Sequence, residues 1–322
     1  MLNSILDAIG RTPLVRLNKI TAGLESRIFA KLEFMNPTGS VKDRIARHMI
    51  EKAETEGKIE AGQLIIESSS GNTAVGLALV AIQKGYRLKV VVRDSLSKEK
   101  LALLRALDVD VHAVDSTLPP ESPESYNNIT PRMAAATPGA YFPDQHNSPD
   151  NNEAHYLTTG PEIWDQMDGK IDYLVAGIGT GGTVCGTSRF LKERDPRIKT
   201  IAVDPEGSIF YDHFHHGKLV EPHTYVVEGL GDEFLIDCPD FQYIDDIYRA
   251  SDHDIFHHAR LLVRSEGILG GGSSGAALWA SMKLANSLDE PARIVTIFPD
   301  SATRYLGSVF NDDWMKERGF LD

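Results

Sequence analysis

Cysteine is scarce in this chain of 322 residues, which contains only Cys185 and Cys238. Without a CxxC pair, neither a disulfide framework nor a cysteine-ligated zinc site is expected, and the composition suits a reducing compartment. The chain also lacks an apolar run of the roughly 18 residues that a membrane span needs. Its first residues carry neither the basic nor the apolar region of a signal peptide, so we expect a cytoplasmic protein that does not associate with a membrane.

Positive charge is also in short supply. Acidic side chains outnumber basic ones, the formal net charge is −13, and no basic run occurs. A nucleic-acid partner is therefore not expected, because binding to a phosphate backbone depends on Lys and Arg. The chain does have 42% apolar residues, enough for a large core. Its length predicts about two domains or sub-domains.

Short apolar runs alternate with segments of helical periodicity along most of the chain. Strands are predicted at 64–66, 88–92, 111–114, 171–176, 200–203 and 293–298. Helices are predicted at 72–84, 97–107, 160–167, 181–192, 252–266 and 274–287. This alternation predicts an α/β fold with parallel sheets flanked by helices. Residues 116–152, rich in Pro, Asn and Ser, are expected to cross between two sub-domains and to form mobile loops.

Lys42 stands where a Pro-Thr-Gly-Ser turn runs into a helical pattern, within residues 36–44. Apolar residues at 45, 49, 50 and 53 have helical spacing, so we expect the lysine in the first turn of a helix. The positive end of the helix dipole disfavours a second cation there and favours the neutral amine that Schiff-base chemistry needs. An ordinary surface lysine at a helix start is the alternative.

Gly and Ser are concentrated at four predicted strand-to-helix junctions, namely 67–73, 177–183, 270–275 and 299–301. Such junctions lie at the carboxyl ends of strands, where α/β proteins bind ligands. The loop at 177–183 is typical of a phosphate cup at a helix N-terminus. It lacks the Lys-Ser/Thr ending of a nucleoside-triphosphate loop. Its G-x-G-x-x-G spacing leaves a nicotinamide dehydrogenase as a minor alternative.

The loop at 67–73 is of a different kind, because three serines, a glycine and an asparagine precede its helix. Hydroxyls and backbone donors at a helix N-terminus suit a substrate carboxylate. Taken alone, the pattern is better explained as helix capping by Ser70 or Asn72.

Histidines gather at 213–216 and at 253–258. Helical spacing puts His253 and His257 on one face, where a metal could bind. A solvated helix face is commoner and no HExxH motif is present, so we expect no metal site.

Six segments occur together in the order typical of one family, and they are residues 9–15, 39–44, 70–73, 179–183, 228–231 and 299–301. They resemble the β-replacement branch of fold-type II pyridoxal-phosphate enzymes, which includes cysteine synthases and cystathionine β-synthases. The catalytic core of cystathionine β-synthase is further resembled by residues 104–107, 122–125, 168–170, 203–209 and 314–321. The resemblance covers nearly the whole chain. The haem ligands and the regulatory domains of some relatives are expected to be absent.

The resemblance implies a fold like that of the tryptophan synthase β-subunit, with a single catalytic unit over 1–322. Two sub-domains are implied, each a twisted, mostly parallel sheet flanked by helices. The smaller, mobile one covers 40–148, and the larger, cofactor-binding one covers 1–39 and 149–322. A homodimer is also implied.

The resemblance further implies a role for each matching residue. Lys42 would bind pyridoxal phosphate as the internal aldimine and later remove the α-proton of the substrate. Asn72 would hydrogen-bond the 3′-oxygen of the ring, and Ser301 would face the pyridine nitrogen. The phosphate would be held by Gly179, Thr180, Gly181, Gly182 and Thr183. The substrate would be bound by Ser69, Ser70, Gly71, Thr73, Gln145, His146 and Gly229.

The implied reaction is β-replacement on L-serine or an O-activated serine through an aminoacrylate intermediate. A thiol or sulfide would add, giving cysteine or a thioether amino acid such as cystathionine, so the partners are small amino-acid substrates. Alternatives are β-replacement with an amine, giving a diaminopropionate-type product, and a serine/threonine dehydratase of the same fold. Thr73 and the Gly-Thr-Gly-Gly-Thr loop disfavour the dehydratase. The joint presence of Lys42, Asn72 and Ser301 disfavours a non-catalytic binding protein.

Four places depart from the family pattern. One is the segment 147–153, which loses the usual Asn-Pro. Ser68 and Ser69 replace a Pro-Thr pair, which keeps one hydroxyl and leaves amine acceptors open. His146 replaces an aromatic residue and would either act as an acid or base for the leaving group or fill the aromatic position. Asp232 stands where the animal cystathionine enzymes have tyrosine, which puts homocysteine as the acceptor in doubt.

Overall fold

The computed structural model describes residues 1–119 and 122–321, which divide into two compact units. Unit 1 comprises Met1–Gly10 and Asn36–Asp150. Unit 2 comprises Arg11–Met35 and the chain from Asn151 onward. Residues 1–10, which the sequence analysis placed with the larger sub-domain, therefore group with the smaller unit. The mobility expected of the smaller sub-domain stays a prediction.

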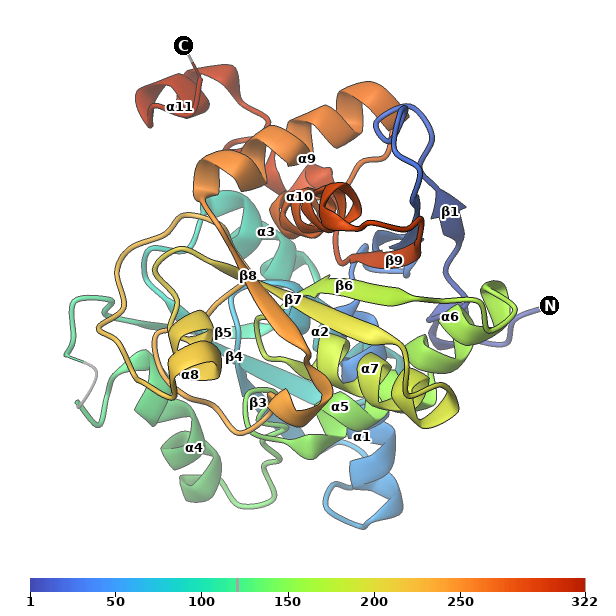
Figure 1. Ribbon diagram of the computed structural model, residues 1–322. Helices are drawn as coiled ribbons and strands as arrows, with labels where there is room; N and C mark the ends of the chain where they lie inside the picture. Colours follow the sequence, from blue (N-terminus) through green and yellow to red (C-terminus); the bar gives the residue numbers. More distant parts are fainter. Residues whose placement is uncertain (120–121, 322) are drawn as a thin grey trace. The chain divides into compact units, whose positions relative to one another are not determined.

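Unit 1 is built on a parallel sheet with the strand order β3-β4-β5 (Figure 1). Its strands are β3 (Leu64–Ser68), β4 (Arg87–Arg93) and β5 (Asp110–Val114). Its helices are η1 (Ile5–Ala8), α1 (Lys42–Thr55), α2 (Asn72–Lys84), α3 (Lys98–Ala106) and α4 (Tyr126–Ala136). The short turn η2 (Glu33–Met35) belongs to unit 2 and ends the first of its two segments. Tyr141 adds a single parallel bridge to Ile65.

The central strand β4 is apolar on both of its faces. Val90 and Val92 join one buried cluster with residues of α1 and α2. Val91 points the opposite way and packs with Val114 and with Ile129 of α4. A parallel strand that is covered on both faces reads as a continuous apolar run, which is why β4 was predictable from sequence.

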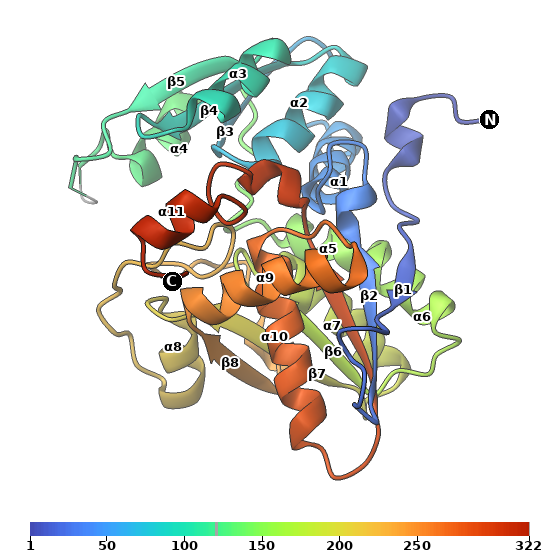
Figure 2. The same cartoon turned by 90° about the horizontal axis from the view of Figure 1, so that it is seen from above.

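Unit 2 is built on a larger sheet with the strand order β1-β2-β9-β6-β7-β8 (Figure 2). The strands are β1 (Leu14–Arg16), β2 (Arg27–Leu32), β6 (Tyr173–Gly177), β7 (Lys199–Pro205), β8 (Asp246–Ala250) and β9 (Arg293–Phe298). All neighbours pair in parallel except β1, which is antiparallel to β2. The helices are α5 (Pro149–Leu157), α6 (Thr159–Gln166), α7 (Gly182–Arg194), α8 (Phe210–His216), α9 (Asp252–Glu266), α10 (Gly272–Ser287) and α11 (Asp312–Glu317), with short turns η3 (Phe241–Tyr243) and η4 (Ala302–Tyr305).

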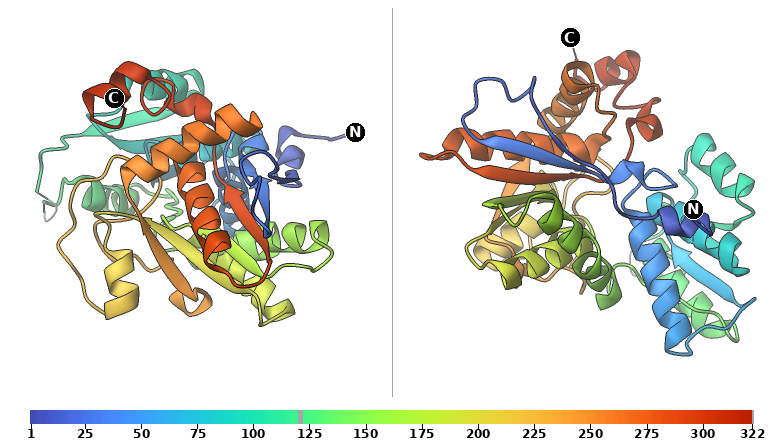
Figure 3. Two further views of the ribbon diagram at one scale, coloured as in Figure 1. Left: turned by 45° about the horizontal axis from the view of Figure 1, so that its top comes forward. Right: turned by 90° about the vertical axis from the view of Figure 1, so that its right-hand side faces the viewer.

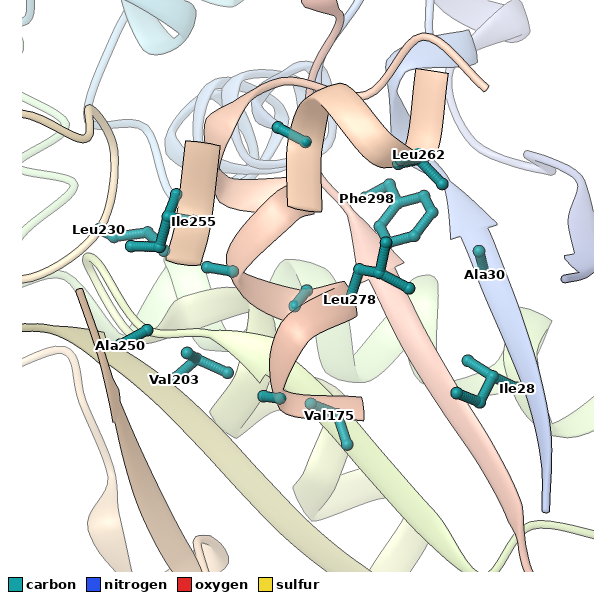
Figure 4. Packing of buried hydrophobic residues seen from close by; sticks show 14 of the residues in the cluster. Ile28, Ala30, Val175, Val203, Leu230, Ala250, Ile255, Leu262, Leu278 and Phe298 are labelled. Carbon is teal, nitrogen blue, oxygen red and sulfur yellow. The ribbon is translucent and has the colours of Figure 1, made fainter. Parts of the chain in front are cut away.

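Helices cover both faces of the unit 2 sheet (Figure 3). Val175 and Val203 point into the cluster formed with α9 and α10, and Figure 4 shows them beside the α10 ribbon. Leu174 and Ala202, one residue earlier on the same strands, point into the cluster formed with α6 and α7. Successive side chains along each strand thus pack into two separate hydrophobic clusters, one on each face of the sheet.

The predicted α/β fold of parallel sheets flanked by helices is confirmed. The predicted strands and helices are all present, with the helix at 72–84 and the strand at 293–298 matching residue for residue. One junction was assigned wrongly. The loop before residue 272 joins α9 to α10 and follows no strand, although Gly270 forms an antiparallel bridge with Ser301.

Over the described residues, none of the helices has both the length and the apolar character needed to cross a membrane. The same residues contain no group of three or more His, Cys, Asp and Glu side chains placed to hold a metal ion.

Candidate active site

Lys42 is the first residue of α1, as the turn and the helical spacing predicted. The turn before it is fixed by Asp43, whose buried carboxylate accepts hydrogen bonds from the Thr38 backbone N–H (2.8 Å) and from the Thr38 hydroxyl. The backbone N–H of Lys42 donates to Ser40 Oγ at 3.3 Å. Lys42 itself is half-buried.

A glycine on α2 lets the two helices of unit 1 approach each other closely beside this lysine. A Cβ atom at Gly76 would lie 3.1 Å from the Lys42 carbonyl oxygen and 3.3 Å from Ala46 Cβ. These separations are tighter than ordinary contacts, so a larger residue would push α2 away. Gly76 therefore helps to fix the backbone of Lys42 against the helix that carries the 67–73 loop.

Ser69 caps the start of α2. Its Oγ accepts hydrogen bonds from the backbone N–H groups of Gly71 and Ala74, each at 3.3 Å. The capping that the sequence analysis assigned to Ser70 or Asn72 is therefore made by Ser69. Because Oγ is used as an acceptor, the Ser69 hydroxyl proton can still be donated to a ligand. Asn72 itself is the first residue of the helix.

Thr73 and Gln145, both predicted to bind substrate, are in direct contact. The buried Thr73 hydroxyl donates to Gln145 Oε1 at 2.6 Å. This bond fixes the orientation of the amide, because the oxygen faces Thr73 and the NH₂ group faces elsewhere. Gln145 is thereby held as a hydrogen-bond donor.

Glu67 joins the same network from the end of β3. It is fully buried, and its Oε1 accepts from the Ser68 backbone N–H at 2.8 Å while its Oε2 accepts from the Gln145 backbone N–H at 3.3 Å. Burial raises the pKa of Glu67 to about 8, against the opposing effect of these two hydrogen bonds. The group is therefore protonated at neutral pH.

His146 lies within electrostatic reach of Lys42 in unit 1. Burial lowers the pKa of His146, and the positive charge of Lys42 lowers it further. The ring is consequently neutral at pH 7, which allows it to accept a proton or to pack as an apolar ring.

The 177–183 loop of unit 2 owes most of its glycines to close packing. A Cβ at Gly179 would lie 2.5 Å from the Gly229 carbonyl oxygen, and one at Gly181 would lie 2.6 Å from Pro239 Cα. The predicted phosphate loop and the predicted substrate residue Gly229 are therefore neighbours. The Gly231 N–H donates to the Ile178 carbonyl at 2.8 Å and ties the two loops together.

Helix α7 begins at Gly182 within this segment, with Gly181 as its N-cap in the left-handed conformation (φ 83°) and without a side-chain cap. The first intrahelical bond of this turn runs from the Cys185 N–H to the Gly181 carbonyl. The N–H groups before it point out of the helix end, as at any uncapped N-terminus. They make this end of α7 a place for an anion.

Two buried side chains of α5 reach the hydroxyls of the same loop. Asn151 Nδ2 donates to Thr180 Oγ1 at 3.1 Å, and His155 Nε2 lies 3.2 Å from Thr183 Oγ1. Both Asn151 and His155 are fully buried. Neither residue has a role predicted from the sequence, because residues up to 152 were assigned to loops and no helix was predicted at the position of α5.

The glycines at 182 and 186 make room for α5 on α7. A Cβ at Gly182 would lie 1.9 Å from Asn151 Oδ1, and one at Gly186 would lie 2.1 Å from the Asn152 carbonyl oxygen. Gly182 was predicted as a phosphate residue, and it is also the residue that admits Asn151.

We expect Gly186→Ala to destabilise the protein by about 1–3 kcal/mol, because the added methyl meets rigid backbone. Gly307→Ala is the matched control, since its Cβ would meet nothing within 4 Å. Urea unfolding of both variants measures the difference. Equal stability of the two variants would show that α5 does not pack tightly on α7.

Ser301 follows the end of β9 and caps the short helix η4. Its Oγ accepts from the Thr303 N–H at 3.2 Å and lies 2.9 Å from Thr303 Oγ1. The preceding Asp300 is buried and accepts from the Tyr305 hydroxyl at 2.6 Å. The predicted contact of Ser301 with a pyridine ring stays a prediction.

Comparison with known proteins identifies the family. A family model described as pyridoxal-phosphate dependent enzyme matches residues 5–300. The chain belongs to this family. It is 44% identical to a cystathionine β-synthase of Apis mellifera over 98% of this chain and 63% of that protein. It is also 44% identical to the cystathionine β-synthase of Mus musculus over 100% of this chain and 57% of that protein.

The chain thus spans about three fifths of the length of these two relatives. A solved structure covers it more completely. The crystal structure of a hydrogen sulfide-producing enzyme from Fusobacterium nucleatum is similar with a TM-score of 0.86 and 36% identity, covering 95% of this chain and 100% of that one. The predicted fold-type II architecture and the predicted cofactor, pyridoxal phosphate, are both confirmed.

A pyridoxal-phosphate enzyme needs an amine for the cofactor's aldehyde and donors for its phosphate dianion. Unit 1 offers Lys42 in the first turn of α1. Unit 2 offers the uncapped start of α7 with the hydroxyls of Thr180 and Thr183. Helix N–H groups and hydroxyl donors suit a phosphate, and a lysine amine suits an aldehyde, so each unit taken by itself has groups that suit one part of the cofactor.

Proposed function

We propose that this chain catalyses β-replacement on L-serine or an O-activated serine. The Cβ–O bond of the donor breaks, a Cβ–S bond forms, and the α-proton of the donor is removed and later returned. Sulfide as the acceptor gives cysteine, and a thiol gives a thioether such as cystathionine. The observation that carries the proposal is the 44% identity to cystathionine β-synthases over 98–100% of this chain.

In this proposal Lys42 has two tasks. Its Nζ holds the cofactor covalently, and it then takes the α-proton of the bound amino acid. Bound pyridoxal phosphate supplies the electron sink that makes this proton acidic. Residues 179–183 hold the phosphate, while Asn72 and Ser301 contact the ring. The placement of Lys42 in the first turn of α1 supports the first task, because that end of a helix disfavours a free ammonium group.

The carboxylate of the amino acid binds at the start of α2, in a turn made by Ser70 and Gly71. The Ser69 hydroxyl proton and the amide NH₂ of Gln145 are the donors, each oriented by the hydrogen bonds described above. A neutral Glu67 behind them supports the assignment, because an ionised carboxylate there would repel the substrate carboxylate.

His146 acts on the acceptor. A neutral imidazole accepts a proton more readily than it donates one, so it suits the deprotonation of an incoming thiol. Asp232, whose N–H donates to Ser208 Oγ at 3.1 Å, lies three residues after Gly229 and would limit which acceptor enters. For this reason homocysteine is tested beside smaller acceptors.

The donor is identified by adding serine, O-acetylserine and O-phosphoserine separately to the yellow holoenzyme. We expect the donor to shift the cofactor absorbance before any acceptor is present, because elimination precedes addition. Mass spectrometry with sulfide, cysteine, homocysteine and small amines then names the product. A colourless protein that takes up no pyridoxal phosphate, or keto-acid release without any adduct, would contradict β-replacement.

Cysteine as a donor is the second candidate, supported by the similarity to the hydrogen sulfide-producing enzyme. In that case the Cβ–S bond of one cysteine breaks, and the leaving group is sulfide. Sulfide release from cysteine is measured with and without a second thiol. Release that requires the second thiol indicates replacement, and release without it indicates elimination.

We also propose a homodimer, on the resemblance to family members. Light scattering of the purified holoenzyme gives the mass directly, and a monomer at working concentration would contradict it.

A further inference from the structure

Helix α5 supplies polar side chains to the loop that we propose for the cofactor phosphate. Asn151 and His155 lie four residues apart on one face of α5 and reach Thr180 and Thr183 respectively. Gly182 and Gly186 of α7 are the positions at which α5 is accommodated. The contact between α5 and α7 therefore pairs small residues on α7 with polar side chains on α5.

The directions of these hydrogen bonds decide what the threonines can do. An amide NH₂ can only donate, so Thr180 Oγ1 is the acceptor from Asn151 and keeps its own proton. His155 has two contacts, since its Nδ1 lies 2.8 Å from the buried Thr159 Oγ1 and its Nε2 lies 3.2 Å from Thr183 Oγ1. A neutral imidazole has one N–H, so one of these threonines donates to it and the other accepts from it.

In one tautomer of His155, the ring donates a hydrogen bond to Thr183, as Asn151 does to Thr180. If the Thr159 hydroxyl donates to Nδ1, the proton of the ring is on Nε2 and is donated to Thr183 Oγ1. Thr183 then keeps its own proton. In the other tautomer Nε2 carries no proton, so the Thr183 hydroxyl donates its hydrogen bond to the ring and not to an anion.

We propose that Asn151 and His155 are positioning residues for the cofactor phosphate: each donates to one threonine of the loop, so that both hydroxyl protons are directed to phosphate oxygens. This inference rests on the proposed phosphate-binding role of residues 179–183. It adds Asn151 and His155, and Thr159 through its contact with His155, to the residues that determine cofactor affinity.

The test compares two ligands on three proteins: the wild type, His155→Asn and His155→Gln. Asparagine places a polar atom near the Nδ1 position and keeps the contact with Thr159, whereas glutamine reaches toward the Nε2 position and Thr183. Apoprotein is titrated with pyridoxal phosphate and with pyridoxal, which has the same aldehyde and no phosphate. Binding is followed by absorbance and by protein fluorescence.

We expect His155→Asn to weaken pyridoxal phosphate binding roughly ten- to hundredfold, the range for losing one hydrogen bond to a charged group. Pyridoxal binding should stay unchanged, and His155→Gln should bind pyridoxal phosphate within a few fold of the wild type. Combining His155→Asn with Thr183→Val should cost little more than Thr183→Val alone, because both remove the same interaction.

His215→Asn is the matched control, since this histidine contacts the Ile247 carbonyl at 3.1 Å and belongs to α8. Asn151→Ala is a second variant in case His155→Asn folds poorly, and it should show the same preference between the ligands. Equal weakening of both ligands, or unchanged pyridoxal phosphate affinity in His155→Asn and Asn151→Ala, overturns the inference. A wild-type protein that binds pyridoxal phosphate no better than pyridoxal overturns the proposed phosphate loop instead.

Discussion

Lys42→Ala should abolish turnover, with a loss of about 1,000-fold or more, and should leave the protein unable to link pyridoxal phosphate covalently. The reason is that one side chain is proposed for two tasks, holding the cofactor and moving the α-proton, and proton transfer alone contributes roughly 100- to 10,000-fold. Lys42→Arg should be equally inactive, because arginine keeps the charge but stays protonated and forms no such link. Steady-state kinetics of the reconstituted variants measures the loss.

Borohydride reduction of the wild-type holoenzyme adds a direct readout, because it fixes the link and allows the labelled peptide to be mapped. The label should be on the peptide that contains Lys42. Lys58→Ala is the matched control, since Lys58 is exposed and pairs with Glu56 at the surface. A label on another lysine, or activity in Lys42→Ala within tenfold of the wild type, would contradict the assignment.

The position of Lys42 could be predicted because its signals are local. A turn rich in Gly and Pro followed by apolar residues at helical spacing defines a helix start without knowledge of the rest of the chain. The same holds for α2, whose end is set by Gly85 in the left-handed conformation (φ 77°). The central strands were predictable because they are apolar on both faces.

Strand β2 was missed because a charge interrupts its apolar run. Lys31 is fully buried, and its Nζ lies 2.7 Å from Glu162 Oε2 and 2.7 Å from the Thr12 carbonyl. These partners are 131 and 19 residues away along the chain. Only the folded structure shows that the charge is compensated, and a lysine in a short apolar run otherwise argues against a buried strand.

In the candidate site, too, some residues could be predicted from the sequence and others only from the folded structure. Residues that we propose to touch the cofactor lie in motifs with a fixed spacing, and the sequence revealed them. Glu67 contacts the proposed substrate residue Gln145, and Asn151 and His155 contact the proposed phosphate loop, through hydrogen bonds between segments that no sequence motif marks. Ser69 is an intermediate case, because its motif was recognised but its capping role depends on the geometry of the turn.

Glu67 gives this network a pH dependence whose sign follows from its burial. The native protein holds the proton of Glu67 up to pH of about 8, whereas the unfolded chain releases it near the ordinary pKa of 4.5. A raised pKa of an acid means that the native state binds the proton more tightly. Below pH of about 4.5 Glu67 is protonated in both states and does not change the free energy of unfolding. As pH rises from about 4.5 to about 8, the free energy of unfolding falls.

Glu67→Gln should remove this loss, because glutamine resembles the protonated acid and never ionises. At about 1.4 kcal/mol for each pKa unit, the wild type loses several kcal/mol across that window and the variant does not. The free energy of unfolding in urea at pH 5, 6.5 and 8 should show the variant gaining on the wild type as pH rises. Glu25 is exposed, so the free energy of unfolding of Glu25→Gln should change with pH as that of the wild type does.

The same substitution separates stability from binding. Above pH 8 an ionised Glu67 beside Gln145 would repel the substrate carboxylate, so the KM for the amino-acid donor should rise in the wild type and stay flat in Glu67→Gln. Parallel stability curves for the two proteins would mean that Glu67 is ionised in the native state. A flat KM in the wild type together with diverging stability curves would place Glu67 in the fold of the loop and outside the recognition of the substrate.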